Sequence, residues 1–133
     1  MGELRKDPVV KRWVIINPQQ RLSLEKTIKE EKKSHVENCP FCSGNESKTP
    51  PEILAFREPG SASNSTGWSV RVTANMFPAL RIEGELERQG IGIYDQMQGI
   101  GAHEVIIDSP VHNASIADMD QYHVEKLLHA YRD

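Results

Sequence analysis

The segment Trp68-Ser-Val-Arg-Val-Thr-Ala74 decides the fold class. Every second residue from Trp68 to Ala74 is apolar, whereas the three residues between them are polar. This alternation predicts a β-strand that turns one face toward a hydrophobic core. The following Asn75-Met-Phe-Pro-Ala-Leu80 ends the strand, because it breaks the alternation and contains a proline. A sheet around residues 68–74 is therefore expected.

Three shorter apolar runs predict further strands. They are Trp13–Ile16, Ile91–Tyr94 and Glu104–Asp108. We expect the first to be a buried strand that leads into a turn at Asn17-Pro18. The other two lie on either side of Gly99 and Gly101, and these glycines allow a hairpin. Short strands of this kind favour an antiparallel sheet.

The hydrophobic period becomes helical from about Asp120, a residue that can cap the amino end of a helix. One stripe of this helix is predicted to carry Val124, Leu127, Leu128 and Tyr131. No glycine cap or proline follows Tyr131, so the helix looks interrupted. The sequence therefore predicts an α+β fold, an antiparallel sheet with flanking helices that is incomplete at its C-terminal end.

Length and composition predict one domain, residues 1–133, with a flexible hairpin loop at about 60–67, where the sequence is Gly-Ser-Ala-Ser-Asn-Ser-Thr-Gly. Hydrophobic residues make up 38% of the chain and charged residues 26%, which is typical of soluble globular proteins. No run has the length of a signal-peptide core or a membrane span, so a cytoplasmic protein without membrane contact is expected. The 16 basic residues are interleaved with 19 acidic ones, which argues against a nucleic-acid partner.

The chemistry begins with Cys39-Pro-Phe-Cys42. Two thiolates at this spacing can bind one tetrahedral metal ion, and zinc is the usual occupant. The alternative is a redox dithiol, which requires a preceding strand and a helix that begins at the motif. Polar residues precede the motif and Pro50-Pro51 follows it, so the sequence favours the metal.

Two cysteines do not complete a structural zinc site, so a histidine is needed. The chain contains His35, His103, His112, His123 and His129. We expect His123 and His129 to be surface residues of the helix, and His103 to be a partly buried, hydrogen-bonded residue beside a strand. His112 follows Asp108-Ser-Pro110, whose turn can bring its ring toward the cysteines. The residues alone favour His112 over His103 only slightly.

Seven blocks in order resemble the amino-terminal half of the galactose-1-phosphate uridylyltransferase family. They are Arg5-Lys-Asp-Pro8, Arg12-Trp-Val-Ile-Ile-Asn-Pro18, Cys39-Pro-Phe-Cys42, Thr49-Pro-Pro-Glu-Ile53, Trp68-Ser-Val-Arg-Val72, Asn75-Met-Phe-Pro-Ala-Leu80 and Gly101-Ala-His-Glu-Val-Ile-Ile-Asp-Ser-Pro-Val-His112. The resemblance implies a histidine-triad fold. It also implies transfer of a nucleoside monophosphate from a nucleotide sugar to a sugar phosphate through a nucleotidyl-histidine intermediate.

The resemblance further implies which residues form the site. It places zinc on Cys39, Cys42 and His112. It assigns nucleotide contacts to Asn75, with Phe41 and Met76 nearby. The family has a phosphate-binding arginine where this chain has Gln20, so Arg21 is expected to take that role after a shift of one residue.

One family element, His-x-His-x-Gln, is absent from the 133 residues. In the family its first histidine is the fourth zinc ligand and its second is the nucleophile. We therefore expect no catalytic residue in this chain, no activity of the chain alone, and self-association, for example a homodimer, through an open sheet edge.

UDP-glucose and galactose 1-phosphate are the expected substrates. An ADP-sugar or dinucleotide phosphorylase of the same superfamily, and a non-catalytic zinc-binding module, are the alternatives.

Overall fold

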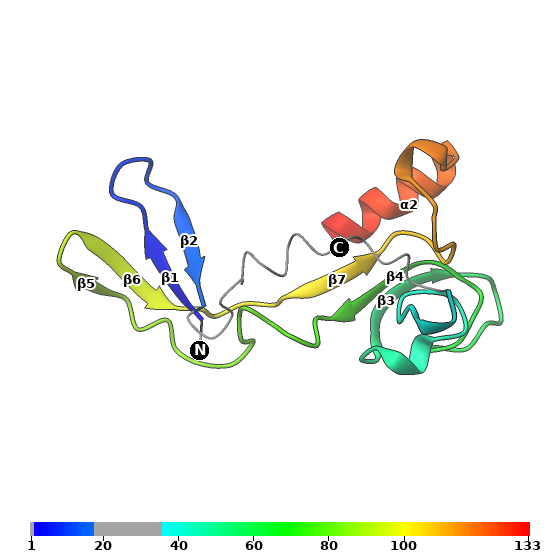
Figure 1. Ribbon diagram of the computed structural model, residues 1–133, viewed down its shortest axis with the longest axis horizontal. Coiled ribbons are helices and arrows are strands. Elements are labelled where there is room, and N and C mark those ends of the chain that lie inside the picture. Colours follow the sequence, from blue (N-terminus) through cyan, green and yellow to red (C-terminus); the bar gives the residue numbers. More distant parts are fainter. Residues whose placement is uncertain (1, 18–35) are drawn as a thin grey trace. The chain divides into compact units, whose positions relative to one another are not determined.

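The structure, a computed structural model, describes residues 2–17 and 36–133. The chain forms two compact units (Figure 1). Unit 1 comprises Met1–Glu30 and Phe77–His103, and unit 2 comprises Glu31–Met76 and Glu104–Asp133. All buried hydrophobic side chains among the described residues belong to unit 2. Within the described ranges, no helix is long and apolar enough to cross a membrane.

Unit 1 contains a four-stranded antiparallel sheet in the order β2-β1-β6-β5. Its strands are β1 (Glu3–Lys6), β2 (Trp13–Ile16), β5 (Gln89–Ile91) and β6 (Tyr94–Gln98). The strand predicted at Trp13–Ile16 is confirmed, but the prediction that it is buried is wrong. Val14 and Ile15 are both exposed, because β2 is an edge strand.

The prediction of a strand at Ile91–Tyr94 is also wrong. Ile91 pairs with Tyr94 across a two-residue turn, so this stretch is the tip of the β5–β6 hairpin. Gly92 adopts a positive φ of 60°, which glycine tolerates without steric penalty. The chain therefore reverses direction within the apolar run that was expected to be a strand.

Unit 2 contains a three-stranded antiparallel sheet in the order β3-β4-β7. Its strands are β3 (Glu52–Arg57), β4 (Trp68–Ala74) and β7 (Glu104–Ile107). The predicted strand at residues 68–74 is confirmed as the central one. The strand at 104–107 is also confirmed, but it pairs with β4 and not in a hairpin with residues 91–94. The α+β class and the antiparallel pairing are confirmed, with the strands divided between two sheets.

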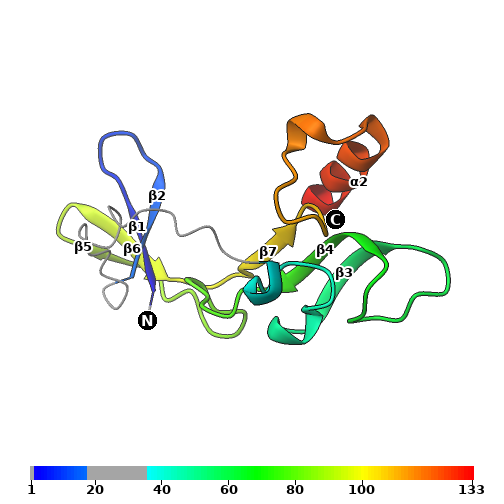
Figure 2. The same cartoon turned by 45° about the vertical axis from the view of Figure 1, so that its right-hand side comes forward.

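One α-helix, α2 (Gln121–Arg132), packs on this second sheet (Figures 1 and 2). The carboxylate of Asp120 accepts a hydrogen bond of 2.9 Å from the backbone of His123, which confirms the predicted cap. The predicted apolar stripe is partly wrong. Leu127 is buried, but Leu128 and Tyr131 are 61% and 64% exposed, and Ala130 lies in the core in their place.

The core between α2 and the sheet is small. It consists of Val70, Val72, Leu127 and Ala130, with Leu54, Phe56 and Ile106 packed around them. The described residues of unit 2 also contain the short 3-10 helices η1 (Val36–Asn38), η2 (Glu46–Lys48) and η3 (Ile116–Asp118).

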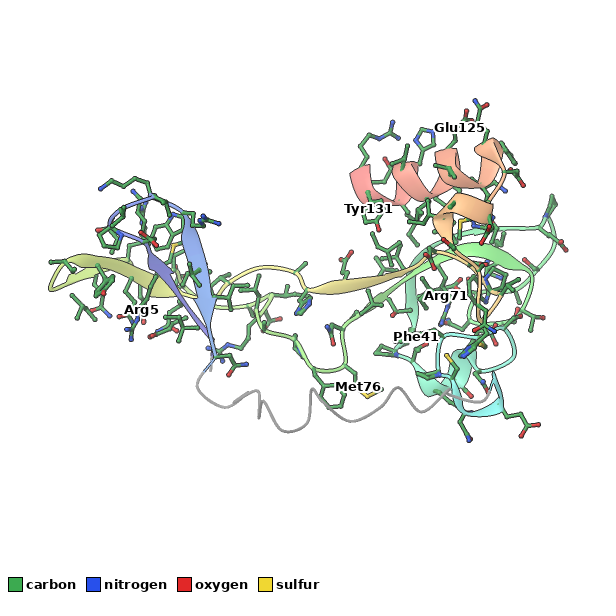
Figure 3. The ribbon with its side chains drawn as sticks, turned by 45° about the horizontal axis from the view of Figure 1, so that its top comes forward. Arg5, Phe41, Arg71, Met76, Glu125 and Tyr131 are labelled. Atoms are coloured by element: carbon green, nitrogen blue, oxygen red, sulfur yellow. The ribbon has the colours of Figure 1, made fainter. Side chains whose placement is uncertain are left out.

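Arg71 on β4, labelled in Figure 3, is almost completely buried and lies at the centre of a polar network. It donates hydrogen bonds to the hydroxyl of Thr49 at 2.7 Å and to the carboxylate of Glu52 at 3.3 Å. Glu52 also binds Arg57, at 2.6 Å. Arg57 donates to the carbonyl of Ala62, so the predicted loop at 60–67 is anchored to β3. The flexibility of that loop stays a prediction.

Candidate metal site and its neighbouring pocket

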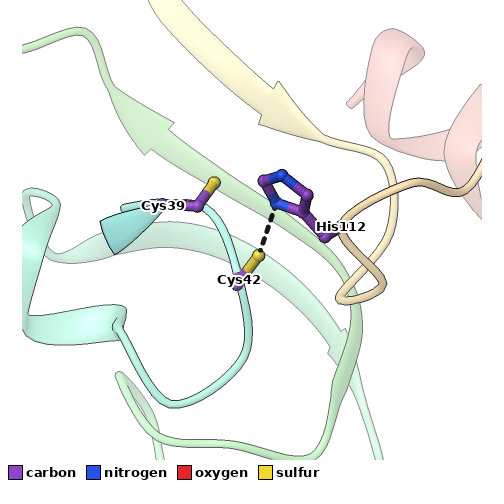
Figure 4. Close-up of side chains that lie close together, drawn as sticks. All are labelled: Cys39, Cys42 and His112. Atoms are coloured by element: carbon purple, nitrogen blue, oxygen red, sulfur yellow. Dashed lines mark hydrogen bonds between the residues drawn. The ribbon is translucent and has the colours of Figure 1, made fainter. Parts of the chain in front are cut away.

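Unit 2 brings together three metal-binding side chains that are far apart in the sequence (Figure 4). One ligand atom each of Cys39, Cys42 and His112 lies within 4.8 Å of the other two. The Cys42 Sγ is 3.1 Å from His112 Nδ1 across a separation of 70 residues. Cys42 is 4% exposed. The structure thus groups the three residues that were predicted to bind zinc.

The cysteine loop is held by hydrogen bonds of its own backbone. The N–H of Cys42 donates to the carbonyl of Cys39 at 3.4 Å, and the N–H of Asn45 donates to the carbonyl of Cys42 at 3.1 Å. The side-chain amide of Asn45 donates a further bond of 2.8 Å to the Cys39 carbonyl. Gly44, which immediately precedes Asn45, has a φ of 94°, a left-handed conformation that favours glycine. The loop therefore forms a tight turn that orients both sulfurs.

Glu46 connects this turn to the sheet, and sequence reasoning did not identify it. Its carboxylate accepts hydrogen bonds from the backbone of Gly44 at 3.0 and 3.1 Å and from the indole of Trp68 at 2.7 Å. Burial raises the pKa of Glu46. Its hydrogen bonds with Trp68, its own backbone and Gly44, together with the nearby charge of Arg71, outweigh that effect and lower the pKa from its ordinary value. The carboxylate is therefore a stable anion at neutral pH.

His112 is positioned by the turn that follows β7. The N–H of Val111 donates to the hydroxyl of Ser109 at 3.1 Å, which reverses the chain before His112. His123 on α2 donates from Nε2 to the carbonyl of Asp108 at 2.6 Å. His123 is therefore half-buried and hydrogen-bonded, and the prediction that it is a surface residue is wrong. The same prediction is confirmed for His129, which is exposed.

The donor set suits zinc. A zinc ion held at about 2.3 Å by sulfur and about 2.0 Å by nitrogen keeps its ligand atoms about 3.5–3.8 Å apart. That value lies between the 3.1 Å of Cys42 to His112 and the 4.8 Å limit of the whole group. No fourth histidine, cysteine or carboxylate joins the group within residues 2–17 and 36–133.

The thiol chemistry argues against the redox alternative. Burial raises the pKa of the Cys42 thiol from its ordinary value, and neighbouring Cys39 raises the pKa further through a hydrogen bond and its charge. Reactive dithiols depend on a lowered thiol pKa. His103, the rival for the third ligand, lies in unit 1, where its Nδ1 accepts a hydrogen bond of 2.9 Å from the backbone of Ala79. It is partly buried and hydrogen-bonded, as predicted.

A pocket of about 280 Å³ adjoins the three residues. Phe41 lines it, together with β7 and the turn that carries His112. Asn75 and Met76, which were also predicted to lie near the nucleotide, follow the end of β4 and do not line this pocket. Arg21 and His35 lie outside the described residues. Of the predicted site residues that the structure describes, Phe41 and the three metal-binding residues line one pocket. Figure 3 labels Phe41 and Met76, and Figure 4 shows the three metal-binding side chains.

Comparison with known proteins identifies the relatives of this chain. An ADP-glucose phosphorylase of Arabidopsis thaliana is 35% identical over 135 residues, which cover 98% of this chain and 37% of that protein. The crystal structure of an ADP-glucose phosphorylase from Arabidopsis thaliana with bound ADP-glucose is 32% identical. It covers 99% of this chain and 36% of its own, with a TM-score of 0.51. No model of a protein family matches.

A structure of a uridylyltransferase shares the fold, with a TM-score of 0.57 over 96% of this chain and 32% of its own, at 21% identity. The fold of the chain is therefore one that also occurs in an ADP-glucose phosphorylase and in a uridylyltransferase. The predicted resemblance is confirmed, and the chain corresponds to an amino-terminal portion of the galactose-1-phosphate uridylyltransferase family. It spans about a third of the length of the relatives it matches.

Proposed function

We propose that this chain forms the zinc-binding portion of a nucleotidyltransferase that acts on a nucleotide sugar. The grouping of Cys39, Cys42 and His112 next to a pocket is the observation that carries the proposal. Relatives that are 32% and 35% identical over nearly the whole chain, among them an ADP-glucose phosphorylase, support it.

The proposed role of zinc is structural. Bound by two thiolates and one imidazole, it would fasten the cysteine loop to the turn after β7. Both of these segments line the pocket, so the metal would fix the shape of one wall. Phe41 has a partly exposed ring between the two cysteines and is proposed to contact the nucleotide. Asn75, Met76 and Arg21 are proposed to contribute further contacts from outside this pocket.

The proposed nucleotide sugar is ADP-glucose, and UDP-glucose with galactose 1-phosphate is the second candidate. The relatives above 30% identity include an ADP-glucose phosphorylase and a structure with bound ADP-glucose. The uridylyltransferase structures are 21% and 22% identical, so they support the fold alone. This evidence favours the adenosine alternative over the uridine substrate that the sequence suggested first.

The chain alone is proposed to bind substrate without turning it over. A nucleotidyl-histidine intermediate requires a histidine in line with the reacting phosphorus. The His-x-His-x-Gln element that supplies it in the family does not occur in residues 1–133. A zinc-binding module without any nucleotide site is the remaining alternative, and it predicts metal binding without affinity for either nucleotide sugar.

Two measurements on the chain test the proposal. Metal analysis after dialysis is expected to find one zinc per chain, and calorimetric titration is expected to give tighter binding of ADP-glucose than of UDP-glucose. Phe41→Ala should weaken that binding, whereas Tyr131→Ala, which removes an exposed aromatic ring from α2, should not. Tighter binding of UDP-glucose would select the second candidate. Zinc binding without nucleotide binding would favour the zinc-binding module, and the absence of both zinc binding and nucleotide binding would refute the proposal.

A further inference from the structure

The strand pairing of unit 2 does not by itself explain how the cysteine loop and His112 come together. The cysteine loop precedes β3, and β3 begins at the carboxyl end of β4, where Glu52 pairs with Thr73. His112 follows β7, which ends toward the amino end of β4, with Ile107 opposite Arg71. Strand pairing alone therefore directs the two halves of the site to opposite ends of β4.

Contacts of the segment between the cysteine loop and β3 solve this problem. Glu46 binds the indole of Trp68, the first residue of β4. Three residues later, Thr49 accepts a bond from Arg71, and Glu52 then pairs with Thr73. The segment thus runs along β4 from its first residue to its end. The first of these contacts brings the cysteine loop to the amino end of β4, the end toward which β7 runs.

We propose that Glu46 is a positioning residue for the metal site. It holds the loop of Cys39 and Cys42 at the amino end of β4, where the turn after β7 presents His112. The inference rests on the proposed zinc binding and extends it to a residue that does not contact the metal.

The chemistry of Glu46 fits this role better than that of a general core residue. A carboxylate that is only 7% exposed is unfavourable unless its oxygens are hydrogen-bonded. Both oxygens of Glu46 accept from the N–H of Gly44, two residues after Cys42, and one also accepts from Trp68. The same side chain therefore connects the loop to the sheet. Glutamine has only one side-chain oxygen, so it cannot accept hydrogen bonds as both carboxylate oxygens do.

Titration of the metal-free chain with Co²⁺ tests the inference, because cobalt reports thiolate coordination by its absorption. Partners that orient metal ligands change affinity by roughly 10–100-fold when they are lost. Glu46→Gln and Trp68→Phe are each expected to weaken Co²⁺ and Zn²⁺ binding about tenfold. The double variant should be little weaker than either single variant, because both substitutions break one connection.

Glu52→Gln is the matched control. It makes the same substitution at a buried carboxylate whose hydrogen-bond partners are Arg57 and Arg71 and not the backbone of the cysteine loop. It is expected to lower stability and leave the Co²⁺ dissociation constant within a factor of two. If Glu46→Gln does not fold without metal, Trp68→Phe decides the question.

The outcomes separate the two proposals. If the natural chain binds Co²⁺ tightly and neither Glu46→Gln nor Trp68→Phe weakens that binding, the positioning role is overturned and the zinc site is kept. A uniform weakening that Glu52→Gln shares would also overturn it, since general destabilisation would then explain the effect. Failure of the natural chain to bind Co²⁺ or Zn²⁺ would overturn the zinc site itself.

Discussion

Leu127→Ala, compared with Leu128→Ala, tests how α2 packs on β4. The two leucines are neighbours on one helix, and the substitution removes the same three carbon atoms from each. Leu127 is 2% exposed and lies in the core with Val70 and Val72, whereas Leu128 is 61% exposed. The difference between the two variants therefore isolates burial from helix propensity.

The expected loss follows from that burial. At about 0.8 kcal/mol for each buried carbon, transfer alone accounts for roughly 2.4 kcal/mol. The cavity left behind adds to this value, and buried leucines typically lose about 2–5 kcal/mol in total. We expect Leu127→Ala to lower the free energy of unfolding by about 3 kcal/mol, because a small core can partly collapse around the gap. Leu128→Ala should change it by less than about 0.5 kcal/mol.

Urea unfolding followed by tryptophan fluorescence provides the assay. Trp68 is buried in unit 2, and a Trp13→Phe background removes the only other tryptophan, so the signal reports the unit that contains α2. Unfolding curves are compared at low protein concentration and fixed zinc, with equal slopes required for a valid difference. Equal losses at the two positions, or a larger loss for Leu128→Ala, would show that the helix buries a different face and would refute the packing.

Three further predictions concern the metal, the pH and the sheet edges. Zinc at a hundred times its dissociation constant should stabilise the chain by about 2.7 kcal/mol. In thermal unfolding, His112→Ala should abolish this stabilisation, and the control His129→Ala, at an exposed histidine, should retain it. Equal zinc effects in both variants would contradict the ligand set. Because folding lowers the pKa of Glu46 from its ordinary value, its stabilisation is present above the unfolded pKa and is lost as the pH falls through the folded pKa. Urea unfolding from pH 7 to pH 3 should show a decline in stability that Glu46→Gln reduces, and identical profiles would contradict the prediction. Within the described residues β3 and β7 are sheet edges, so sedimentation should show self-association, and a strictly monomeric profile would count against it.

Local sequence signals predicted the elements whose causes are local. The alternation of apolar and polar residues at 68–74 identified β4, because the whole pattern lies within one strand. Asp120 was recognisable as a helix cap because its hydrogen bond reaches only three residues along the chain. The Cys39-Pro-Phe-Cys42 turn is local in the same sense. The α+β class and the cysteine half of the site follow from these signals.

Features that depend on long-range packing were missed. The apolar run of β2 resembles a buried strand, yet its position at the edge of a sheet leaves Val14 and Ile15 exposed. The helical stripe cannot reveal that Ala130, and not Leu128, faces the sheet. Glu46 stands in a polar stretch, where nothing distinguishes a buried glutamate from a solvated one. Its indole partner is 22 residues away.

The choice between His103 and His112 shows how such a long-range cause decides a site. The two histidines flank β7, whose first and last residues are about 10 Å apart at the usual rise of a strand. Since β7 runs antiparallel to β4, from opposite Ala74 to opposite Arg71, the segment that follows β7, and not the one that precedes it, continues toward the Trp68 end of β4. Glu46 brings the cysteines to Trp68, so His112 is the histidine that meets them. The sequence contains both candidate histidines, but the strand direction and one buried carboxylate select between them.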